Sequence, residues 1–284
     1  MGIDIEHLRR WIGRIETATD IVSERLVTGF QATLGEGPLR PGDIAPLAIH
    51  WCLAPAMVPP DKAGRDGHPA KGGFLPPVSL PRRMWAGGSL RFHDALRVGD
   101  EVTRVSRIAE VTAKTGRSGQ LCFVSVEHEF RTGRSLAIME RQDIVYRDSQ
   151  VHPSQAKGEA TGAPAPEWQH SVRADTLLLF RYSALTFNGH RIHYDHPYAT
   201  GVEGYPGLVV HGPLQATLLL QFAARIRGEC PQEFSYRGLR PMFDGEEIRI
   251  NARPYEGGLK LWTADRLPQP AMAADATWGQ QGNG

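Results

Sequence analysis

Asn188, His193 and Gly212 are the residues of this sequence whose types and spacing could do chemistry. They lie in a turn-rich stretch, residues 180–213, that contains one Asn, four His and one Asp. His193 can take up and return a proton near neutral pH. Gly212-Pro213 is typical of a helix start, and the segment 214–226 that follows is apolar nearly all round, which predicts a buried helix. A proton-transfer group beside free helix N–H groups favours chemistry that stabilises an enolate oxygen.

Each of these residues also has a purely structural interpretation. His193 could cap or pack the turn. Asn188 can orient a water or hold a thioester oxygen but cannot act as a base at neutral pH, and beside Gly189 it is also favoured by turn geometry. Gly212 could point its N–H at a developing oxyanion or could serve only the chain's entry into the helix. His211 could contact a substrate or be buried and hydrogen-bonded.

Basic residues in the first half of the chain are weaker candidates for binding. Lys114 and Arg117 flank the glycines of KTGRSG, which could contact a phosphate or form an ordinary hairpin. Arg83 and Trp85 in PRRMWAGG could face an acyl or adenine group, although a packed loop is the simpler interpretation. The histidines lack thiolate or carboxylate partners at ligand spacing, so we expect no metal site.

Composition excludes several classes of protein. The 284 residues include 32 basic and 31 acidic side chains, a balance that argues against a general nucleic-acid or anionic-membrane binder. The three cysteines (Cys52, Cys122 and Cys230) are far apart and odd in number, which favours reduced thiols over a disulfide framework. No apolar run reaches transmembrane length. We therefore expect a cytoplasmic protein without a membrane partner.

The predicted elements repeat loosely across two halves. In the first half we expect a helix over 17–34, capped by Thr17, Thr19 or Asp20, then a long loop over 45–86 and strands over 89–96, 100–114, 121–132 and 137–148. In the second half we expect a strand over 175–184, the polar loop, a helix over 213–227 and strands over 234–243, 246–254 and 258–265. This order predicts an α+β architecture in which curved antiparallel sheets wrap a central helix. The predicted boundaries are a first domain over 1–148, a linker over 149–170, a second domain over 171–267 and a flexible tail over 268–284.

The polar loop carries a family resemblance. FNGHRIHYDHPYA followed by GYPGLVVHGPL resembles the hydratase loop and helix start of the MaoC-like, hot dog-fold enoyl-CoA hydratases. In that pattern His193 falls on the family's catalytic His, and Gly212 falls on the Gly whose N–H forms the oxyanion hole. Asn188 stands where the common pattern has its catalytic Asp. RYSALTFNGHRIHYD and the first-half segments 66–92 and 114–129 are similar to a subgroup with a degenerate first hot dog, which includes 3-methylfumaryl-CoA (mesaconyl-CoA) and itaconyl-CoA hydratases.

The resemblance implies a double hot dog and reversible syn addition of water to an α,β-unsaturated CoA thioester. His193 would activate the water, Asn188 would orient it, and Gly212 would help to hold the thioester oxygen. A short branched dicarboxylic acyl group would need a cation, for which Arg191, Arg181 and Arg83 are the candidates. No cofactor beyond the substrate's own coenzyme A is implied, and a homodimer is plausible. The alternatives are an acyl-CoA thioesterase and a non-catalytic acyl-CoA-binding pseudo-hydratase or partner subunit.

Overall fold

The strands form one continuous antiparallel sheet of ten strands in the computed structural model, which describes residues 3–35, 39–116, 119–148, 164–267 and 269–279. The strand order is β1-β3-β4-β5-β2-β7-β10-β9-β8-β6. The first five strands come from the first half of the chain: β1 (Ile15–Ile21), β2 (Arg82–Phe92), β3 (Glu101–Gly116), β4 (Gly119–Arg131) and β5 (Leu136–Arg147). The other five come from the second half: β6 (Trp168–Arg173), β7 (Glu233–Gly238), β8 (Glu247–Tyr255), β9 (Gly258–Ala264) and β10 (Met272–Thr277).

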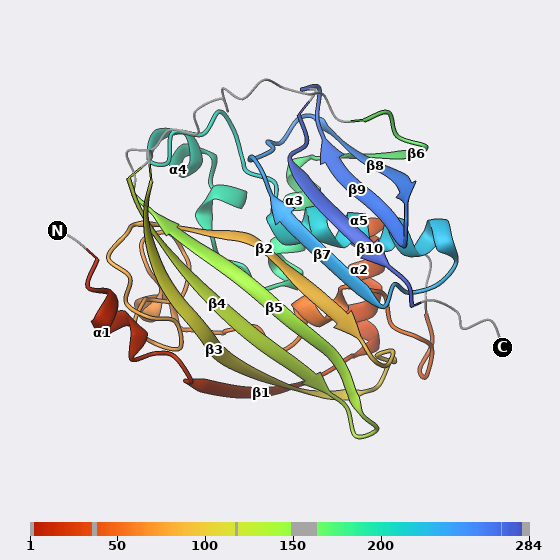
Figure 1. Cartoon of the computed structure of the whole chain (residues 1–284), viewed down its shortest axis with the longest axis horizontal. Helices are drawn as coiled ribbons and strands as arrows, with labels where there is room; N and C mark the ends of the chain where they lie inside the picture. Colours follow the sequence, from red (N-terminus) through yellow and green to blue (C-terminus); the bar gives the residue numbers. More distant parts are fainter. Residues whose placement is uncertain (1–2, 36–38, 117–118, 149–163, 268, 280–284) are drawn as a thin grey trace.

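The two halves share one topology. Within each half the edge strand comes first in sequence, and the order 1-3-4-5-2 corresponds to 6-8-9-10-7. The halves join edge to edge where β2 pairs with β7, from Gly87 opposite Arg237 to Arg91 opposite Glu233. The sequence-based expectation of an α+β double hot dog is therefore confirmed, with its two curved sheets fused into one (Figure 1).

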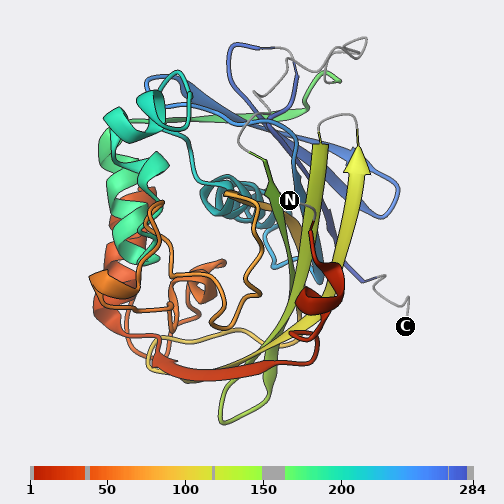
Figure 2. The same ribbon diagram turned by 90° about the vertical axis from the view of Figure 1, so that its left-hand side faces the viewer.

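The helices lie on one side of this sheet. They are α1 (Ile5–Arg9), α2 (Glu24–Leu34), α3 (Thr176–Leu185), α4 (His196–Gly201) and α5 (Gly212–Arg227), with 3-10 turns η1 (Ile49–Cys52), η2 (Pro60–Lys62) and η3 (Arg191–His193). Figure 2 shows α2 and α3 in an outer layer, with α5 between them and the sheet. Helix α5 packs against strands from both halves, and nine of its residues are buried. None of the helices among the described residues is long and apolar enough to cross a membrane.

Local capping explains where the main helices begin and end. The side chain of Asp175 accepts the N–H of Leu178 at the start of α3, and Ser23 does the same for Leu26 in α2. Helix α5 starts at Gly212-Pro213. Proline is tolerated in the first turn because an N–H there would have no intrahelical partner. The helix ends at Gly228, which has a positive φ of 75° and donates its N–H to the carbonyl of Ala224.

Several sequence-based predictions of secondary structure were wrong, including the end of the loop predicted over 45–86, where residues 82–86 begin β2, and the end of the strand predicted over 234–243, which stops at Gly238. Residues 17–21, predicted to start a helix, belong to β1 and pair with β3, so Ser23 caps α2. Most of the strand predicted over 175–184 is helix α3, because Asp175 caps it and its buried positions follow a helical spacing. Residues 272–277 of the predicted tail form β10, whose alternate residues are buried between β7 and β9. Small alanines at those positions carry little strand signal.

Of the predicted linker, residues 149–163 lie outside the described residues, and 168–170 begin β6.

The first half contains no counterpart of α5 in the part of 39–81 that the structure describes. This segment forms η1, η2 and loops, as its many prolines and glycines predict. The interior of the first half is therefore built of loop, and that loop reaches toward the second half.

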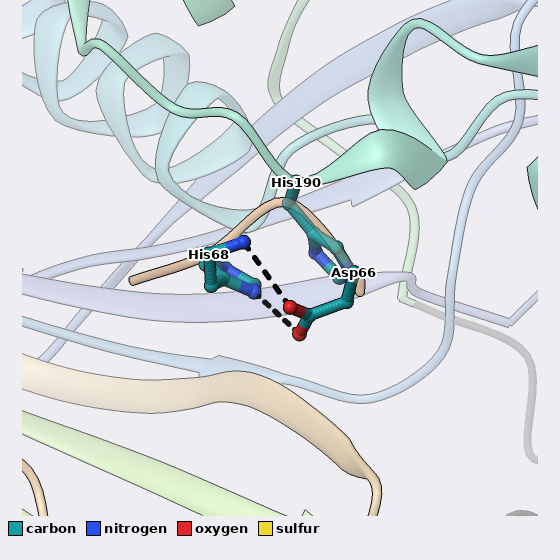
Figure 3. A group of neighbouring side chains, drawn as sticks. All are labelled: Asp66, His68 and His190. Atoms are coloured by element: carbon teal, nitrogen blue, oxygen red, sulfur yellow. Dashed lines mark hydrogen bonds and ion pairs between the residues drawn. The ribbon is translucent and has the colours of Figure 1, made fainter. Parts of the chain in front are cut away.

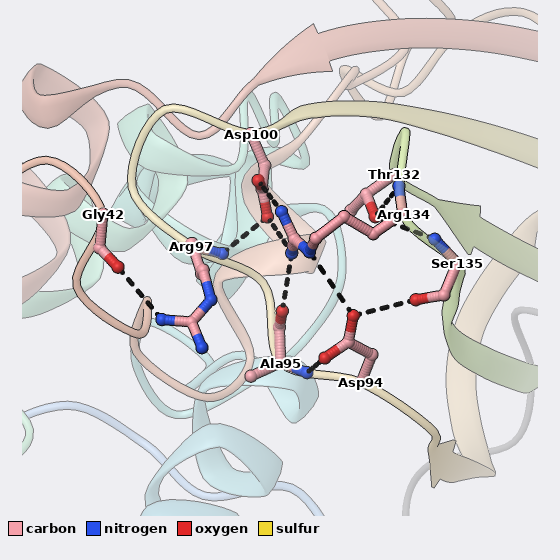
Figure 4. Close-up of polar contacts among 8 residues, drawn as sticks. All are labelled: Gly42, Asp94, Ala95, Arg97, Asp100, Thr132, Arg134 and Ser135. Carbon is pink, nitrogen blue, oxygen red and sulfur yellow. Dashed lines mark hydrogen bonds and ion pairs between the residues drawn. The ribbon is translucent and has the colours of Figure 1, made fainter.

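A polar network fixes the connections at one end of the first-half strands (Figure 4). Arg134 binds both carboxylate oxygens of Asp100 at 2.5 and 2.8 Å, and Ser135 donates to Asp94 at 2.8 Å. Arg97 donates to the carbonyl of Gly42 at 3.1 Å. The contacts of Arg134 and Ser135 connect the β4–β5 hairpin to the β2–β3 connection. Because the ion pairs are partly exposed, they orient the hairpin and add little to the free energy of unfolding.

Candidate active site

His193 is held as a neutral imidazole with one nitrogen free. Its Nδ1 lies 2.7 Å from the carbonyl oxygen of Val209, which can only accept, so Nδ1 carries the proton. Burial lowers the pKa of His193 to about 4, although the bond to Val209 acts in the opposite direction. The ring is therefore neutral at physiological pH, and Nε2 has an unshared electron pair. Because His193 lines the large cavity described below, this is the arrangement of a general base.

His211 supports His193 from behind. Their rings stack with centroids 3.7 Å apart and planes 17° apart. His211 is fully buried, and its Nε2 forms a hydrogen bond of 2.8 Å with Oγ of Ser183. Burial lowers the pKa of His211 well below its usual value, so the stacked pair carries no charge repulsion. Of the two roles left open by the sequence, the structure shows the buried, hydrogen-bonded one.

Gly212 places the start of α5 against the cavity wall. The first N–H groups of a helix have no intrahelical partner and favour a negative charge. A Cβ at Gly212 would lie 3.0 Å from Cε3 of Trp85, so the absence of a side chain lets β2 approach the helix start. Trp85 in turn stacks on Tyr236, with centroids 4.5 Å apart. Both aromatic rings line the same cavity as His193 and Gly212.

Asn188 shapes the loop between α3 and η3 and also reaches the cavity. Its N–H bonds to the carbonyl of Ser183, and its Oδ1 accepts the N–H of His190 at 3.0 Å. The turn-forming role is thus present, while the amide nitrogen is left for a ligand.

We expect Asn188→Asp to keep the fold and to retain or raise activity. A carboxylate can accept the same His190 N–H, so the free energy of unfolding should change by no more than about 0.5 kcal/mol. Steady-state turnover and thermal unfolding of the variant check this. Complete loss of turnover in a normally folded variant would instead show that the reaction needs an amide donor at this position.

A loop of the first half completes this wall. Gly67 has a φ of 90°, and a Cβ there would lie 1.8 Å from the carbonyl oxygen of Gly189. The N–H of Arg191 donates to the carbonyl of Asp66 at 2.9 Å. Loop 63–70 therefore docks directly on the loop that carries Asn188 and His193.

This docking brings Asp66 and His68 beside His190 (Figure 3). Asp66 accepts two bonds from His68, from Nδ1 at 2.9 Å and from the backbone N–H at 3.1 Å. The rings of His68 and His190 have centroids 4.2 Å apart, and those of His190 and His193 are 5.3 Å apart. Burial lowers the pKa of His68, while Asp66 acts in the opposite direction. Burial alone would raise the pKa of Asp66, but its bonds to His68 lower it overall.

Most of these groups line one large, open cavity of about 2440 Å³ between the two halves, whereas Asp66 and His211 are not part of its lining. Nine Lys and Arg side chains line it, against three carboxylates, so it suits an anionic ligand. Arg83, two residues before Trp85 on β2, is one of the nine and forms no ion pair within the described residues. Lys114 lines the cavity as well.

The other sequence-predicted binding residues lie elsewhere. The guanidinium of Arg191 binds Asp195 at 2.7 Å and lies 4.1 Å from the ring centroid of Tyr198, outside the cavity lining. Asp195 also caps α4. Arg181 is exposed on α3 and reaches the carbonyl of Ala32 at 3.4 Å. Arg117 lies outside the described residues. The sequence predicts no role for Asp66 and His68. The segment that contains them, DGHPAKGG, contributes only to the family resemblance.

A second buried polar group, Glu140, lies in the first half. It accepts Nε1–H of Trp51 at 2.7 Å and the amide of Gln142 at 2.8 Å. Burial raises the pKa of Glu140 from 4.5 to about 7. Nearby His50 is also fully buried, and burial lowers its pKa to about 3, so it is neutral at pH 7.

We expect Glu140 to make the folded state less stable as the pH rises. Since its pKa is higher in the folded protein, its contribution is fully present below pH 4.5 and is lost as the pH rises through about 7. Glu140→Gln mimics the protonated form, so it should gain on the order of 3 kcal/mol relative to wild type between pH 4.5 and 8. Denaturant unfolding of both proteins across this range measures the difference. A difference in the free energy of unfolding that stays constant across this pH range would contradict the raised pKa of Glu140.

The fold and this site define a hydratase or dehydratase of the MaoC-like hot dog type. The model of the family "Hydroxyacyl-thioester dehydratase type 2" matches residues 48–244. A mesaconyl-C(4)-CoA hydratase of Chloroflexus aurantiacus is 41% identical, covering 94% of this chain and 95% of that protein. Among solved structures, a MaoC-like dehydratase from Phytophthora capsici has a TM-score of 0.68 at 15% identity, covering 96% of this chain and 98% of that one. A double-hotdog protein of Mycobacterium tuberculosis has a TM-score of 0.57 at 13% identity, covering 93% and 95%.

The chain therefore belongs to the hydroxyacyl-thioester dehydratase type 2 family. It is a hydro-lyase, as the hydratase loop predicted.

Proposed function

We propose that this protein adds water reversibly, with syn stereochemistry, to a short branched dicarboxylic α,β-unsaturated CoA thioester such as 3-methylfumaryl-CoA or itaconyl-CoA. The observation that carries the proposal is the position of His193, whose Nδ1 bonds to Val209 and whose Nε2 makes no hydrogen bond within the described residues, in one cavity with the start of α5. No cofactor and no metal take part in the proposed reaction.

The chemistry follows from these positions. The N–H of Gly212, at the positive end of α5, polarises the thioester carbonyl and stabilises the enolate oxygen. Nε2 of His193 takes a proton from the water that attacks the β-carbon. The side chain of Asn188 orients that water. Losing one oxyanion donor typically lowers the rate on the order of a hundred- to a thousand-fold, so the helix start contributes as strongly as the base.

The cationic lining supports a CoA ester with a second carboxylate. Phosphates of coenzyme A suit the excess of Lys and Arg in the cavity, of which Lys114 is one. Arg83 forms no ion pair among the described residues, although its charge acts on Asp66, and it shares a strand face with Trp85, which lies beside the helix start. We therefore assign the free carboxylate of the acyl group to Arg83. The mesaconyl-C(4)-CoA hydratase that is 41% identical to this chain has a name that fits such a substrate.

The function is tested with purified protein and four esters: crotonyl-, mesaconyl-C(4)-, mesaconyl-C(1)- and itaconyl-CoA. The readout is loss of enoyl-thioester absorbance, with one added water seen by mass spectrometry. Hydration of a dicarboxylic ester supports the proposal. Release of free thiol would make the protein a thioesterase, and binding of every ester without turnover would make it a pseudo-hydratase.

Arg83→Gln is expected to change selectivity. Removing a charged hydrogen-bond donor from the free carboxylate should lower kcat/KM for the preferred dicarboxylic ester about 10- to 100-fold and leave that for crotonyl-CoA nearly unchanged. Arg225→Gln, an exposed substitution on α5, is the matched control. An equal loss on both esters would assign Arg83 to coenzyme A or to the fold instead.

A further inference from the structure

Hydration needs a second proton transfer, and the loop's carboxylate, Asp195, is bound to Arg191 and caps α4 outside the cavity lining. Water gives up a proton as it attacks the β-carbon, and the α-carbon must gain one. Asn188 stands where a carboxylate is common, and an amide cannot transfer a proton at neutral pH. Either His193 performs both transfers or another group reaches the substrate.

Asp66 and His68 have the geometry of such a group. The carboxylate accepts Nδ1–H of His68 at 2.9 Å, which fixes the ring orientation. Burial lowers the pKa of His68, and the bond to Asp66 offsets part of that effect in favour of the imidazolium form. Nε2 of His68 makes no hydrogen bond within the described ranges, and His68 lines the cavity with His193. The side chains of His68 and Asp66 are 21% and 22% exposed, so the pair is sheltered but reachable.

The neighbouring His190 is less suited to this role. Its ring lies between those of His68 and His193, at 4.2 and 5.3 Å, and makes no hydrogen bond among the described residues. No carboxylate is hydrogen-bonded to this ring among the described residues. Burial together with the two neighbouring rings lowers the pKa of His190, although the charge of Asp66 acts in the opposite direction.

Asp66, His68 and His190 also offer three atoms within 4.8 Å of one another, as a metal site would. However, Nδ1 of His68 bonds to Oδ2 of Asp66, and Oδ1 of Asp66 accepts the backbone N–H of His68, so both carboxylate oxygens are already engaged. The geometry is that of a hydrogen-bonded pair.

We propose that His68 is a catalytic residue that exchanges the α-carbon proton, with Asp66 as its positioning residue. This assignment rests on the proposed hydratase function. In hydration His193 takes a proton from water as the C–O bond forms at the β-carbon. The π electrons move to the α-carbon as the enolate, and imidazolium His68 gives its proton there to form the C–H bond. One proton then passes from His193 to His68 through solvent in the cavity. His68 and His193 lie on the same wall of the cavity, so both would act on one face of the substrate double bond, as syn addition requires.

The test separates the two proton transfers. Hydration of mesaconyl-C(4)-CoA requires both groups. Deuterium uptake in D₂O by the saturated thioester, methylsuccinyl-CoA with its unbranched carboxyl on CoA, requires only the α-carbon base, because no hydroxyl group leaves. We expect His68→Gln to lose hydration by about 100-fold or more and to lose α-deuterium uptake with it. His193→Gln should lose hydration but keep most of the uptake. Asp66→Asn should lower both activities by less than His68→Gln does.

His196→Gln, an exposed substitution at the start of α4, is the control for changing a histidine near this loop. Binding of CoA to each variant checks the fold. Normal hydration by His68→Gln would overturn the proposal, as would loss of uptake in His193→Gln with uptake kept in His68→Gln. So would activity removed by a chelator and restored by Zn²⁺. If His68→Gln fails to fold, Asp66→Asn with unchanged uptake would overturn it. Failure of the proposed function is distinct, because wild type itself would hydrate no ester.

Discussion

His193→Gln is expected to lower hydratase turnover by about 10²- to 10⁴-fold while the protein stays folded. The substitution removes Nε2, the free nitrogen of a ring whose Nδ1 is engaged by Val209. A side chain of similar size remains over His211, so the buried stack loses contact area but leaves no large void. The measurement is the steady-state rate on the preferred ester, with His196→Gln as the control on the same loop. Near-normal turnover would remove the assignment of His193 as the base.

The same residue predicts a pH dependence. Burial lowers the pKa of His193 to about 4, so its neutral form is present at and above pH 5 and is lost only as the pH falls through about 4. We therefore expect kcat/KM not to fall when the pH is lowered from 7 to 5. A decline centred near pH 6.5, the value of an exposed imidazole, would show that the ring is solvated in solution.

Gly67→Ala is expected to have the second largest effect, although residue 67 has no reactive group. A Cβ there would lie 1.8 Å from the carbonyl oxygen of Gly189, a backbone atom that can move only if one loop shifts. A displacement of about 1 Å in a catalytic loop can lower the rate on the order of 100-fold. Turnover should fall by about that factor, because His68 and the loop carrying His193 would separate.

Gly72→Ala, a few residues further along the chain from the docking loop, is the matched control. Gly72 has a φ of 91°, close to the 90° of Gly67, but a Cβ there would meet only Cβ of Pro77 at an ordinary 3.5 Å. Both variants therefore share the strain of a positive φ, about 1 kcal/mol of stability, and only Gly67→Ala adds the contact with the partner loop. Equal turnover in the two variants would show that loop docking does not affect the reaction.

The agreement between the predicted and observed secondary structure differs from element to element. Strands β3, β4 and β5 were predicted closely, because long alternating runs of β-branched residues mark them. Helix α5 was predicted within a residue from Gly212-Pro213 and its apolar run. Helix α3 was missed, since TLLLFRYSAL is apolar at both helical and strand spacing, and β10 was missed because its alternation is carried by alanines.

By itself, the sequence determined the hydratase loop, the start of α5 and the family. These depend on local order along the chain: Asn188, His193 and Gly212 follow one another within a single loop and helix start. Only the tertiary structure decided what surrounds them. Asp66 and His68 are more than 100 residues away from His190 in sequence and meet it only because Gly67 and Gly189 pack backbone to backbone. Such contacts join distant segments by shape, and no spacing within either segment encodes them.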